Sequence, residues 1–132
     1  MLHDLRVLEL PSGIAGSYCA KLLADAGAEV VKIEGPDGDP LRRWSASGAD
    51  LGGDDGALFR FLNTSKRSVV ADLSSGEVED LLAGADVLVE TGAVDPRRLA
   101  GRHPRLMIVS ITRFGRTGPW AGRPATEFTL QA

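Results

Sequence analysis

The sequence has little cysteine, few aromatic residues and no long apolar run. Its single cysteine, Cys19, cannot form a disulfide within the chain, and its place among apolar residues of a predicted helix favours a buried structural thiol over a nucleophile. No stretch approaches the roughly 20 apolar residues of a membrane span, and no charged start precedes a short apolar segment as in a signal peptide. These absences predict a cytoplasmic protein with no membrane partner.

An excess of basic charge is missing as well. The 132 residues carry a formal net charge of -3, so the chain lacks the broad basic field of a nucleic-acid-binding protein. The two histidines, His3 and His103, both precede predicted strands, and no group of histidine, cysteine and carboxylate residues has metal-ligand spacing. We therefore expect no metal site and no bound nucleic acid, in a chain of one domain's length.

A strand, turn, helix and second strand are predicted within residues 5–34. Val7 to Leu10 form a short apolar run, and Gly27 stands where a left-handed residue ends a helix. Between them, residues at helical spacing predict a buried helix face: Ala15, Tyr18, Cys19, Leu22, Leu23 and Ala26. The segment is a βαβ unit, for which a right-handed crossover is expected.

The first turn of this unit contains Gly13 and Gly16. Backbone amides there, together with the helix N-terminus, can face a ligand phosphate. Glu34 lies about 20 residues downstream at a strand end, where an NAD-type domain places an acidic group for a ribose hydroxyl. The third glycine of the dinucleotide fingerprint is missing. The alternative, glycines that serve only a tight turn and close helix packing, therefore stays open.

The rest of the chain alternates predicted strands and helices. A glycine-rich loop at residues 41–56 is expected to lie over the carboxyl edge of the sheet and to be the most mobile or poorly packed segment. Residues 57–62 predict helical turns with Phe59 and Leu62 facing the core, and Asp95 predicts a helix N-cap. Strands are predicted at 68–71, 87–89 and 106–111, the last covered on both faces, and helices at 77–82 and from 127. The pattern indicates a parallel α/β sheet with the first strand central and ligands beyond its carboxyl ends.

The order of the motifs resembles family III of the CoA-transferases, the CaiB/BaiF family. The matching pieces, from Leu2 to Ala132, are LHDLRVLEL, AGSYCAKLLADAGAEVVKIEGPDGDPLRRW, FLNTSKRSVVADL, ADVLVE, HPRLMIVSITRFGRTGPW and EFTLQA. The resemblance implies a Rossmann-like parallel sheet with flanking helices, here the N-terminal part of the family's large domain. Residues 1–132 would then be a partial CoA-binding domain of a larger enzyme that pairs as an interlocked homodimer.

Members of this family move coenzyme A between carboxylic acids or racemise 2-methylacyl-CoA thioesters. The resemblance therefore implies acyl-CoA and a carboxylic acid as substrates, with no permanently bound cofactor. The transferases' nucleophilic aspartate is expected beyond residue 132, so we assign no catalytic residue and expect this chain alone to be inactive. Thr126 stands where racemases have a histidine, which disfavours racemisation. An NAD-type dinucleotide-binding domain and a degenerate, non-catalytic assembly module remain as alternatives.

The family's contacts with coenzyme A come from loops that follow the first, third, fourth and fifth strands. Carried over residue by residue, the resemblance implies nine CoA-binding positions: Gly13, Ile14, Ala71, Ser74, Thr91, Gly92, Arg98, Thr112 and Arg113. The two arginines suit the phosphates of coenzyme A as charge-assisted donors. The sequence departs from the family at Gly35, where many members have a basic residue, and at Thr91-Gly92-Ala93, where asparagine, phenylalanine and arginine are usual.

Two further expectations concern packing. The helix between Asp72 and Asp86 is about one turn shorter than is usual in the family. Apolar surface around the strand at 106–111 and at Phe128 and Leu130 is expected to lack a cover, which predicts self-association of the chain.

Overall fold

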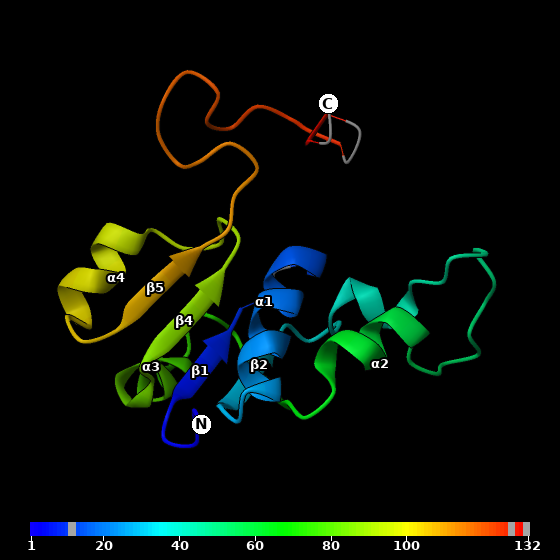
Figure 1. Ribbon diagram of the computed structural model, residues 1–132, viewed down its shortest axis with the longest axis horizontal. Helices are drawn as coiled ribbons and strands as arrows, with labels where there is room; N and C mark the ends of the chain where they lie inside the picture. Colours follow the sequence, from blue (N-terminus) through cyan, green and yellow to red (C-terminus); the bar gives the residue numbers. More distant parts are fainter. Residues whose placement is uncertain (11–12, 127–128, 131–132) are drawn as a thin grey trace.

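A computed structural model describes residues 1–10, 13–126 and 129–130 of the chain. Figure 1 shows the elements in chain order: β1 (Arg6–Glu9), α1 (Gly13–Asp25), β2 (Glu29–Glu34), the 3-10 helix η1 (Pro40–Arg43), α2 (Ala57–Asn63), β3 (Arg67–Val70), α3 (Gly76–Gly84), β4 (Val87–Glu90), α4 (Pro96–Arg102) and β5 (Met107–Ser110). Within this part of the chain, no helix is both long and apolar enough to span a bilayer.

Five parallel strands form one sheet in the order β3-β2-β1-β4-β5. In the register of the sheet, Val7 of β1 lies between Val30 of β2 and Val87 of β4. The predicted α/β fold with β1 at the centre is therefore confirmed. The chain builds β2 and β3 on one side of β1 and then β4 and β5 on the other. Ligands of such sheets bind where this order reverses, which here is beyond the carboxyl ends of β1 and β4.

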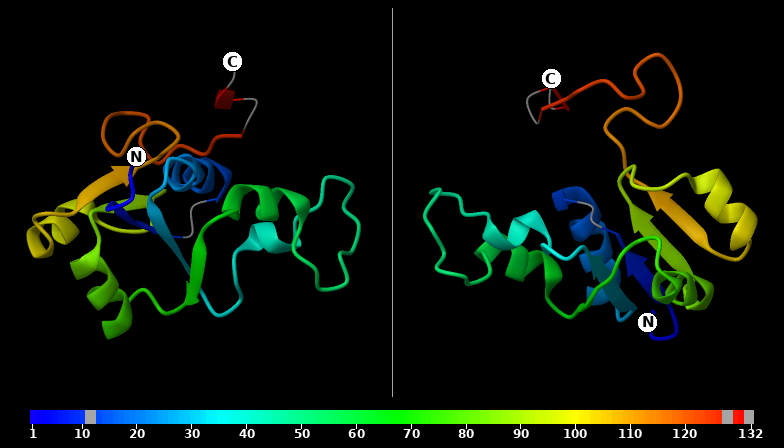
Figure 2. Two further views of the ribbon diagram at one scale, coloured as in Figure 1. Left: turned by 60° about the horizontal axis from the view of Figure 1, so that its bottom comes forward. Right: turned by 180° about the vertical axis from the view of Figure 1, so that it is seen from behind.

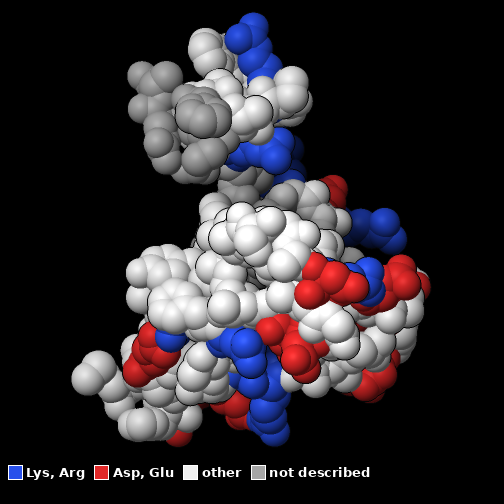
Figure 3. All heavy atoms as spheres, turned by 90° about the vertical axis from the view of Figure 1, so that its right-hand side faces the viewer, with Lys and Arg blue, Asp and Glu red and all other residues white. Residues whose placement is uncertain are grey.

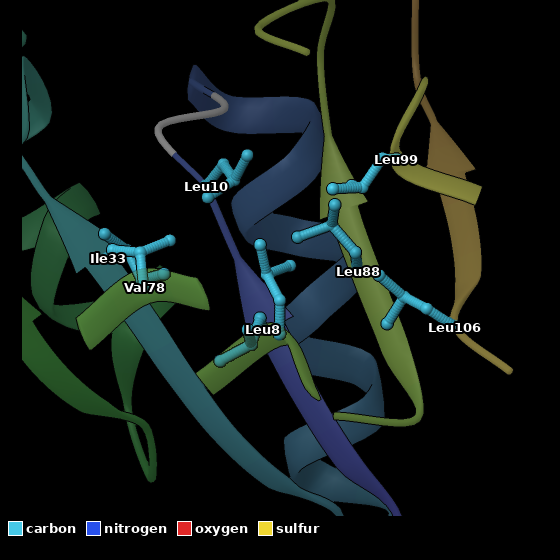
Figure 4. Packing of buried hydrophobic residues seen from close by; sticks show 8 residues of the cluster. Leu8, Leu10, Ile33, Val78, Leu88, Leu99 and Leu106 are labelled. Carbon is cyan, nitrogen blue, oxygen red and sulfur yellow. The ribbon is translucent and has the colours of Figure 1, made fainter. Parts of the chain in front are cut away.

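Helices cover both faces of the sheet (Figure 2) because successive side chains of each strand point to opposite faces. On the face covered by α3 and α4, the buried side chains are Leu8, Leu10, Ile33, Val78, Leu82, Leu88, Leu99 and Leu106 (Figure 4). On the face covered by α1, they are Val7, Ala20, Ala24, Ala28, Val30, Val87 and Val89. The first face holds mostly leucines and the second mostly alanines and valines, so α1 packs more closely on the strands than α3 and α4 do.

This close packing corrects the prediction for the buried face of α1. The buried residues include Gly16, Ala20 and Ala24, four positions apart, whereas Tyr18 and Leu22 are 47% and 52% exposed. Small residues let the helix backbone approach the strands, and larger side chains on that face would hold it away. Of the predicted residues, Cys19 and Leu23 do pack against this core, whereas Ala15, Tyr18 and Leu22 are exposed, so hydrophobicity alone predicted the buried face only in part.

Cys19 lies at the margin of this packing, half-buried against the α1 face of the sheet. Burial raises the pKa of its thiol, and this fits the structural role expected from the sequence. Gly27 ends α1 with φ +101°, also as predicted.

Local patterns placed the other strands and α-helices within two residues of their observed bounds, whereas η1 lies where the sequence predicted only turns and a loop. The strand expected at 68–71 is Arg67–Val70, and the helix expected at 77–82 is Gly76–Gly84. In α2, Phe59 and Leu62 are buried as predicted. The helix expected from residue 127 falls largely outside the described residues.

Two other expectations are wrong. The strand β5 is not covered on both faces: Met107 is 64% exposed and the remaining residues are half-buried, because β5 is the sheet's edge and has only β4 as a neighbour. The glycine-rich loop does not cover the strand ends but extends outward past α2, on the far side of that helix from the strands (Figure 1). Within residues 43–54 only Ser45 and Leu51 are even half-buried, so the loop is poorly packed, while its mobility stays a prediction.

Candidate functional site

A cavity opens at the point where the strand order reverses. It has a volume of about 280 Å³ and lies between α3 and α4, where the loops after β1, β3 and β4 meet. Its lining is mostly apolar, with charged residues from α4 and its cap: Leu10, Leu73, Val78, Leu82, Leu88, Val94, Asp95, Arg98, Leu99 and Arg102. Apolar walls with a few placed polar groups are typical of small-molecule sites.

The start of α4 places Arg98 on this cavity. The Asp95 side chain accepts hydrogen bonds from the amides of Arg97 at 3.0 Å and Arg98 at 3.5 Å, and Pro96 occupies the first helical position. The guanidinium of Arg98 has no acidic partner among the described residues, whereas Arg102 pairs with Glu79. Arg98 is therefore the cation of this cavity that an anionic ligand can engage.

The loop after β4 is held from inside by Glu90, whose side chain is fully buried. Its Oε2 accepts hydrogen bonds from the amides of Gly92 at 2.6 Å and Val94 at 3.5 Å. Its Oε1 accepts from the hydroxyl of Ser110 and from Nη2 of Arg116, the latter at 3.1 Å. One carboxylate thus fixes the loop that contains two of the predicted CoA-binding residues, and it also joins this loop to Ser110 of β5 and to Arg116 beyond β5.

The predicted residues after β1 lie at the start of α1. Gly13 has a φ of +58° and Ile14 is 54% exposed, so this backbone is accessible at the carboxyl edge. Gly16 is different: it lies inside α1, buried against the sheet. The hypothesis that both glycines face a phosphate is therefore wrong for Gly16, which serves helix packing.

The predicted residues after β3 and β5 have mixed surroundings. Ala71 packs partly against the core under α3. Ser74 is exposed, and its amide and hydroxyl donate to the Asp72 carboxylate, which lowers the pKa of Asp72. Thr112 is half-buried and Arg113 is exposed, with no acidic partner for Arg113 in the described part of the chain.

All nine predicted residues lie at or just beyond the carboxyl edge of the sheet, but only Arg98 lines the cavity. The cavity residues Leu73 and Val94 are close in sequence to Ser74 and Gly92. The loops that carry the predicted residues therefore meet at the cavity, although Ser74 and Gly92 themselves do not line it. Arg113 and its neighbour Thr112 lie outside the cavity lining.

A buried ionic cluster on the α1 face was missed by the sequence analysis. Glu9 lies between two lysines, with Oε1 2.6 Å from Nζ of Lys32 and Oε2 2.6 Å from Nζ of Lys66. Lys32 also lies 2.7 Å from a carboxylate oxygen of Asp39, and Ser17 donates to Glu9 at 2.6 Å. Burial acts to raise the pKa of Glu9, but the charge of Lys32 and the hydrogen bonds of this cluster hold it below its ordinary value.

This cluster joins segments that are far apart in sequence. Lys66 donates to Glu9, to the backbone carbonyl of Ser17 at 2.8 Å and to Asn63 at 3.0 Å, which uses its three hydrogens. Burial lowers the pKa of Lys66 below its ordinary value. The cluster therefore fixes the first turns of α1 against β1 and the segment before β3. The available signal was a charged residue within an apolar strand, as at Lys32 in EVVKIE.

Glu34 is not available for a ribose hydroxyl. Its two oxygens accept from Nη2 and Nε of Arg42, both at 2.7 Å, and also from Ser68 and the amide of Asp39. Burial acts to raise the pKa of Glu34, yet these hydrogen bonds lower it to about 2. The carboxylate is thus an internal anchor for η1, and the hypothesis of an NAD-type acidic group there is wrong.

The charge on one side of the molecule gives no support to a nucleic-acid site there. On the side shown in Figure 3, acidic and basic groups are interspersed without a continuous basic area. Among the described residues, no group of three or more histidine, cysteine or carboxylate side chains is arranged to hold a metal ion.

Comparison with known proteins agrees with this geometry. The family model described as CoA-transferase family III matches residues 2–132. A succinate–glutarate CoA-transferase of Agrobacterium fabrum is 36% identical, with 98% of this chain and 36% of the relative covered. A succinyl-CoA:mesaconate CoA-transferase of Haloarcula hispanica is 39% identical, with 99% of this chain and 37% of the relative covered.

The crystal structure of a CaiB/BaiF family protein from Brucella suis matches with a TM-score of 0.85 at 37% identity, over 98% of this chain and 38% of that one. The chain thus spans about a third of the length of the relatives that it matches. The match extends over nearly every element described above, including the strand ends that form the cavity. On this evidence, the chain belongs to family III of the CoA-transferases.

Proposed function

We propose that this chain is the CoA-binding part of an acyl-CoA:carboxylate CoA-transferase. The observation that supports the proposal most directly is Arg98, a guanidinium with no acidic partner among the described residues, on an apolar cavity at the switch point of the sheet. Two relatives are named as enzymes that act on dicarboxylates or their CoA thioesters, which makes such acids the first substrates to test.

Coenzyme A has the two features that this edge can accommodate, an adenine ring and several phosphate charges. In the proposal the ring occupies the apolar cavity, and Arg98 donates to a phosphate beside it. Arg113 supplies a second positive charge beyond β5, and the pantetheine arm extends along the carboxyl edge toward the backbone of Gly13 and Ile14. The backbone of Thr91 and Gly92 borders the same path.

The chemistry is proposed from the family. An aspartate beyond residue 132 attacks the thioester carbonyl and expels the CoA thiolate, which leaves a mixed anhydride. The thiolate then attacks the aspartyl carbonyl, releases the product acid and forms an enzyme–CoA thioester that the acceptor acid resolves. Backbone amides of glycine loops stabilise the oxyanions of these steps. The proposal places the enzyme in the cytoplasm as a homodimer, and this chain alone should bind coenzyme A without turnover.

Calorimetric titration of the chain with coenzyme A and with NADH tests the proposal. We expect heat of binding for coenzyme A and none for NADH, and we expect Arg98→Gln to raise the Kd for coenzyme A about tenfold. Arg97→Gln is the matched control, because Arg97 is the exposed neighbour on α4 and does not line the cavity. Equal affinities for Arg98→Gln and wild type, or preferential binding of NADH, would contradict the assignment.

The alternatives are weaker on specific grounds. An NAD-type domain needs a free acidic group after its second strand, and Glu34 is fully engaged by Arg42 and Ser68. A racemase of the same family would need a base where Thr126 stands. If the chain binds no coenzyme A, a non-catalytic assembly module is the better hypothesis. Turnover of succinyl-CoA with an acceptor acid by the pure chain would show that the aspartate expected beyond residue 132 is not required.

A further inference from the structure

Arg116 lies in the loop beyond β5 and reaches back to the loop beyond β4. Its Nε donates to the hydroxyl of Ser110 at 3.0 Å, and its Nη2 donates to Glu90 at 3.1 Å and to the backbone carbonyl of Val94. Val94 and Glu90 lie 22 and 26 residues before Arg116 in the sequence. The guanidinium therefore adds a side-chain contact between the two loops, beyond the backbone hydrogen bond from Ile111 to Glu90 at the strand ends.

Val94 is held through both of its backbone groups. Its amide donates to Oε2 of Glu90, and its carbonyl accepts from Arg116. The same residue lines the cavity together with Leu73 and Arg98. A contact that fixes Val94 thus fixes one wall of the proposed CoA site and the backbone that leads into the cap of α4.

We propose that Glu90 and Arg116 form an internal latch that positions loop 91–95, and with it the cavity wall and Arg98, for coenzyme A. This inference rests on the proposed function and deepens it: Arg116 is a positioning residue that supports binding without contacting the ligand. Its donors already point inward, to Glu90, Ser110 and Val94, and its side chain is only 31% exposed.

A positioning role and a direct phosphate contact differ in their response to salt. Screening weakens the attraction between a ligand phosphate and a guanidinium, so removing a direct contact flattens the salt dependence of the Kd. Removing Arg116 alone would also leave the charge of Glu90 uncompensated. The double variant Glu90→Gln/Arg116→Gln removes the latch as a neutral pair, so in a positioning role it raises the Kd but leaves the salt dependence unchanged. Arg98→Gln provides the comparison for a direct contact.

The experiment titrates coenzyme A into wild type, Arg116→Gln, Arg116→Lys, Arg98→Gln and Arg67→Gln at low and high salt (about 0.05 and 0.2 M). Arg67→Gln is the matched control, since it removes an arginine–glutamate pair with Glu29 at the opposite end of the sheet. We expect Arg116→Gln to raise the Kd about tenfold, and Arg116→Lys to recover part of the affinity. The double variant Glu90→Gln/Arg116→Gln, titrated in the same way, should raise the Kd with an unchanged salt dependence. Arg98→Gln should also raise the Kd but with a flatter salt dependence, and Arg67→Gln should bind as wild type does.

Amide hydrogen exchange of Gly92, measured by NMR without ligand, tests the latch independently of coenzyme A. Its hydrogen bond to Glu90 should open about tenfold more often in Arg116→Gln than in wild type or Arg67→Gln. Unchanged exchange overturns the latch whatever the binding result. Faster exchange with an unchanged Kd overturns the positioning role. A flattened salt dependence in the double variant makes Arg116 a ligand contact, and a wild type that binds no coenzyme A refutes the proposed function instead. If Arg116→Gln does not fold, the same comparisons are made with Arg116→Lys.

Discussion

Glu34→Gln is expected to destabilise the fold by an amount that depends on pH. The Glu34 side chain is 1% exposed, and its carboxylate accepts hydrogen bonds from Nε and Nη2 of Arg42. The Arg42 guanidinium also lies 4.1 Å from the centre of the Phe59 ring. Glutamine has one carbonyl oxygen for donors that now meet two oxygens, and it has no charge. The native interactions lower the pKa of Glu34 from 4.5 to about 2, which corresponds to about 3 kcal/mol of stability above the unfolded-state pKa.

The direction of the pH effect follows from the lowered pKa. The stabilisation by Glu34 is present in full above pH 4.5 and is lost as the pH falls through about 2, because the carboxylate then becomes protonated in the folded state too. The free energy of unfolding of wild type should therefore exceed that of Glu34→Gln at neutral pH, and this difference should shrink steadily across the acid range.

Urea unfolding followed by circular dichroism at a series of pH values measures this difference. Glu29→Gln is the matched control, because Glu29 is also a β2 glutamate paired with an arginine but its side chain is 47% exposed. An exposed pair of this kind should contribute less than about 1 kcal/mol. Similar losses for the two variants, or a difference between wild type and Glu34→Gln that stays constant with pH, would refute the reasoning.

Three other measurements test the packing. Gly56→Ala should destabilise the chain by more than about 1 kcal/mol, because the added Cβ would clash with the carbonyl oxygen of Trp44. Gly101→Ala, in open space on α4, should instead stabilise it by about 0.5 kcal/mol. Thermal melts compare the two variants, and equal shifts in melting temperature would contradict the predicted clash. Glu9→Gln should cost about 3–5 kcal/mol in urea unfolding because it leaves two buried lysines short of a charge partner, and a loss below about 1 kcal/mol would show that the cluster is not stabilising. Light scattering should show self-association of the wild type, reduced in Leu22→Ser because Leu22 is 52% exposed on α1; a monodisperse wild-type monomer at high concentration would exclude it.

The sequence predicted the elements whose signals are local. The apolar runs of β1 and β2, the left-handed Gly27 and the Asp95 cap each depend on residues within one turn or one strand, and each is found where it was expected. The central place of β1 followed from the alternation of strands and helices, which permits few connections in a parallel sheet.

The buried ion pairs and the buried face of α1 depend on residues that are distant in sequence. Lys66 and Glu9 are 57 residues apart, and Arg116 and Glu90 are 26 apart, so neither pair is visible until the register of the sheet is known. The buried face of α1 was predicted only in part, for a related reason. Ala20 and Ala24 carry a weaker hydrophobic signal than Leu22, yet the distance between helix and sheet, which the sequence does not state, favours the small residues.

The three central strands of the sheet each end in a glutamate, at Glu9, Glu34 and Glu90, and each of these side chains is at most 1% exposed. Three carboxylates near the proposed CoA-binding edge would repel a ligand such as coenzyme A if their charges were not compensated. Each is instead met by a cation within about 3 Å: Lys32 and Lys66 at Glu9, Arg42 at Glu34 and Arg116 at Glu90. The carboxylates can therefore fix the loops from inside while their charge is cancelled locally. Arg98 and Arg113, which have no acidic partners in the described part of the chain, then keep an uncompensated positive charge, as the proposed binding of coenzyme A requires.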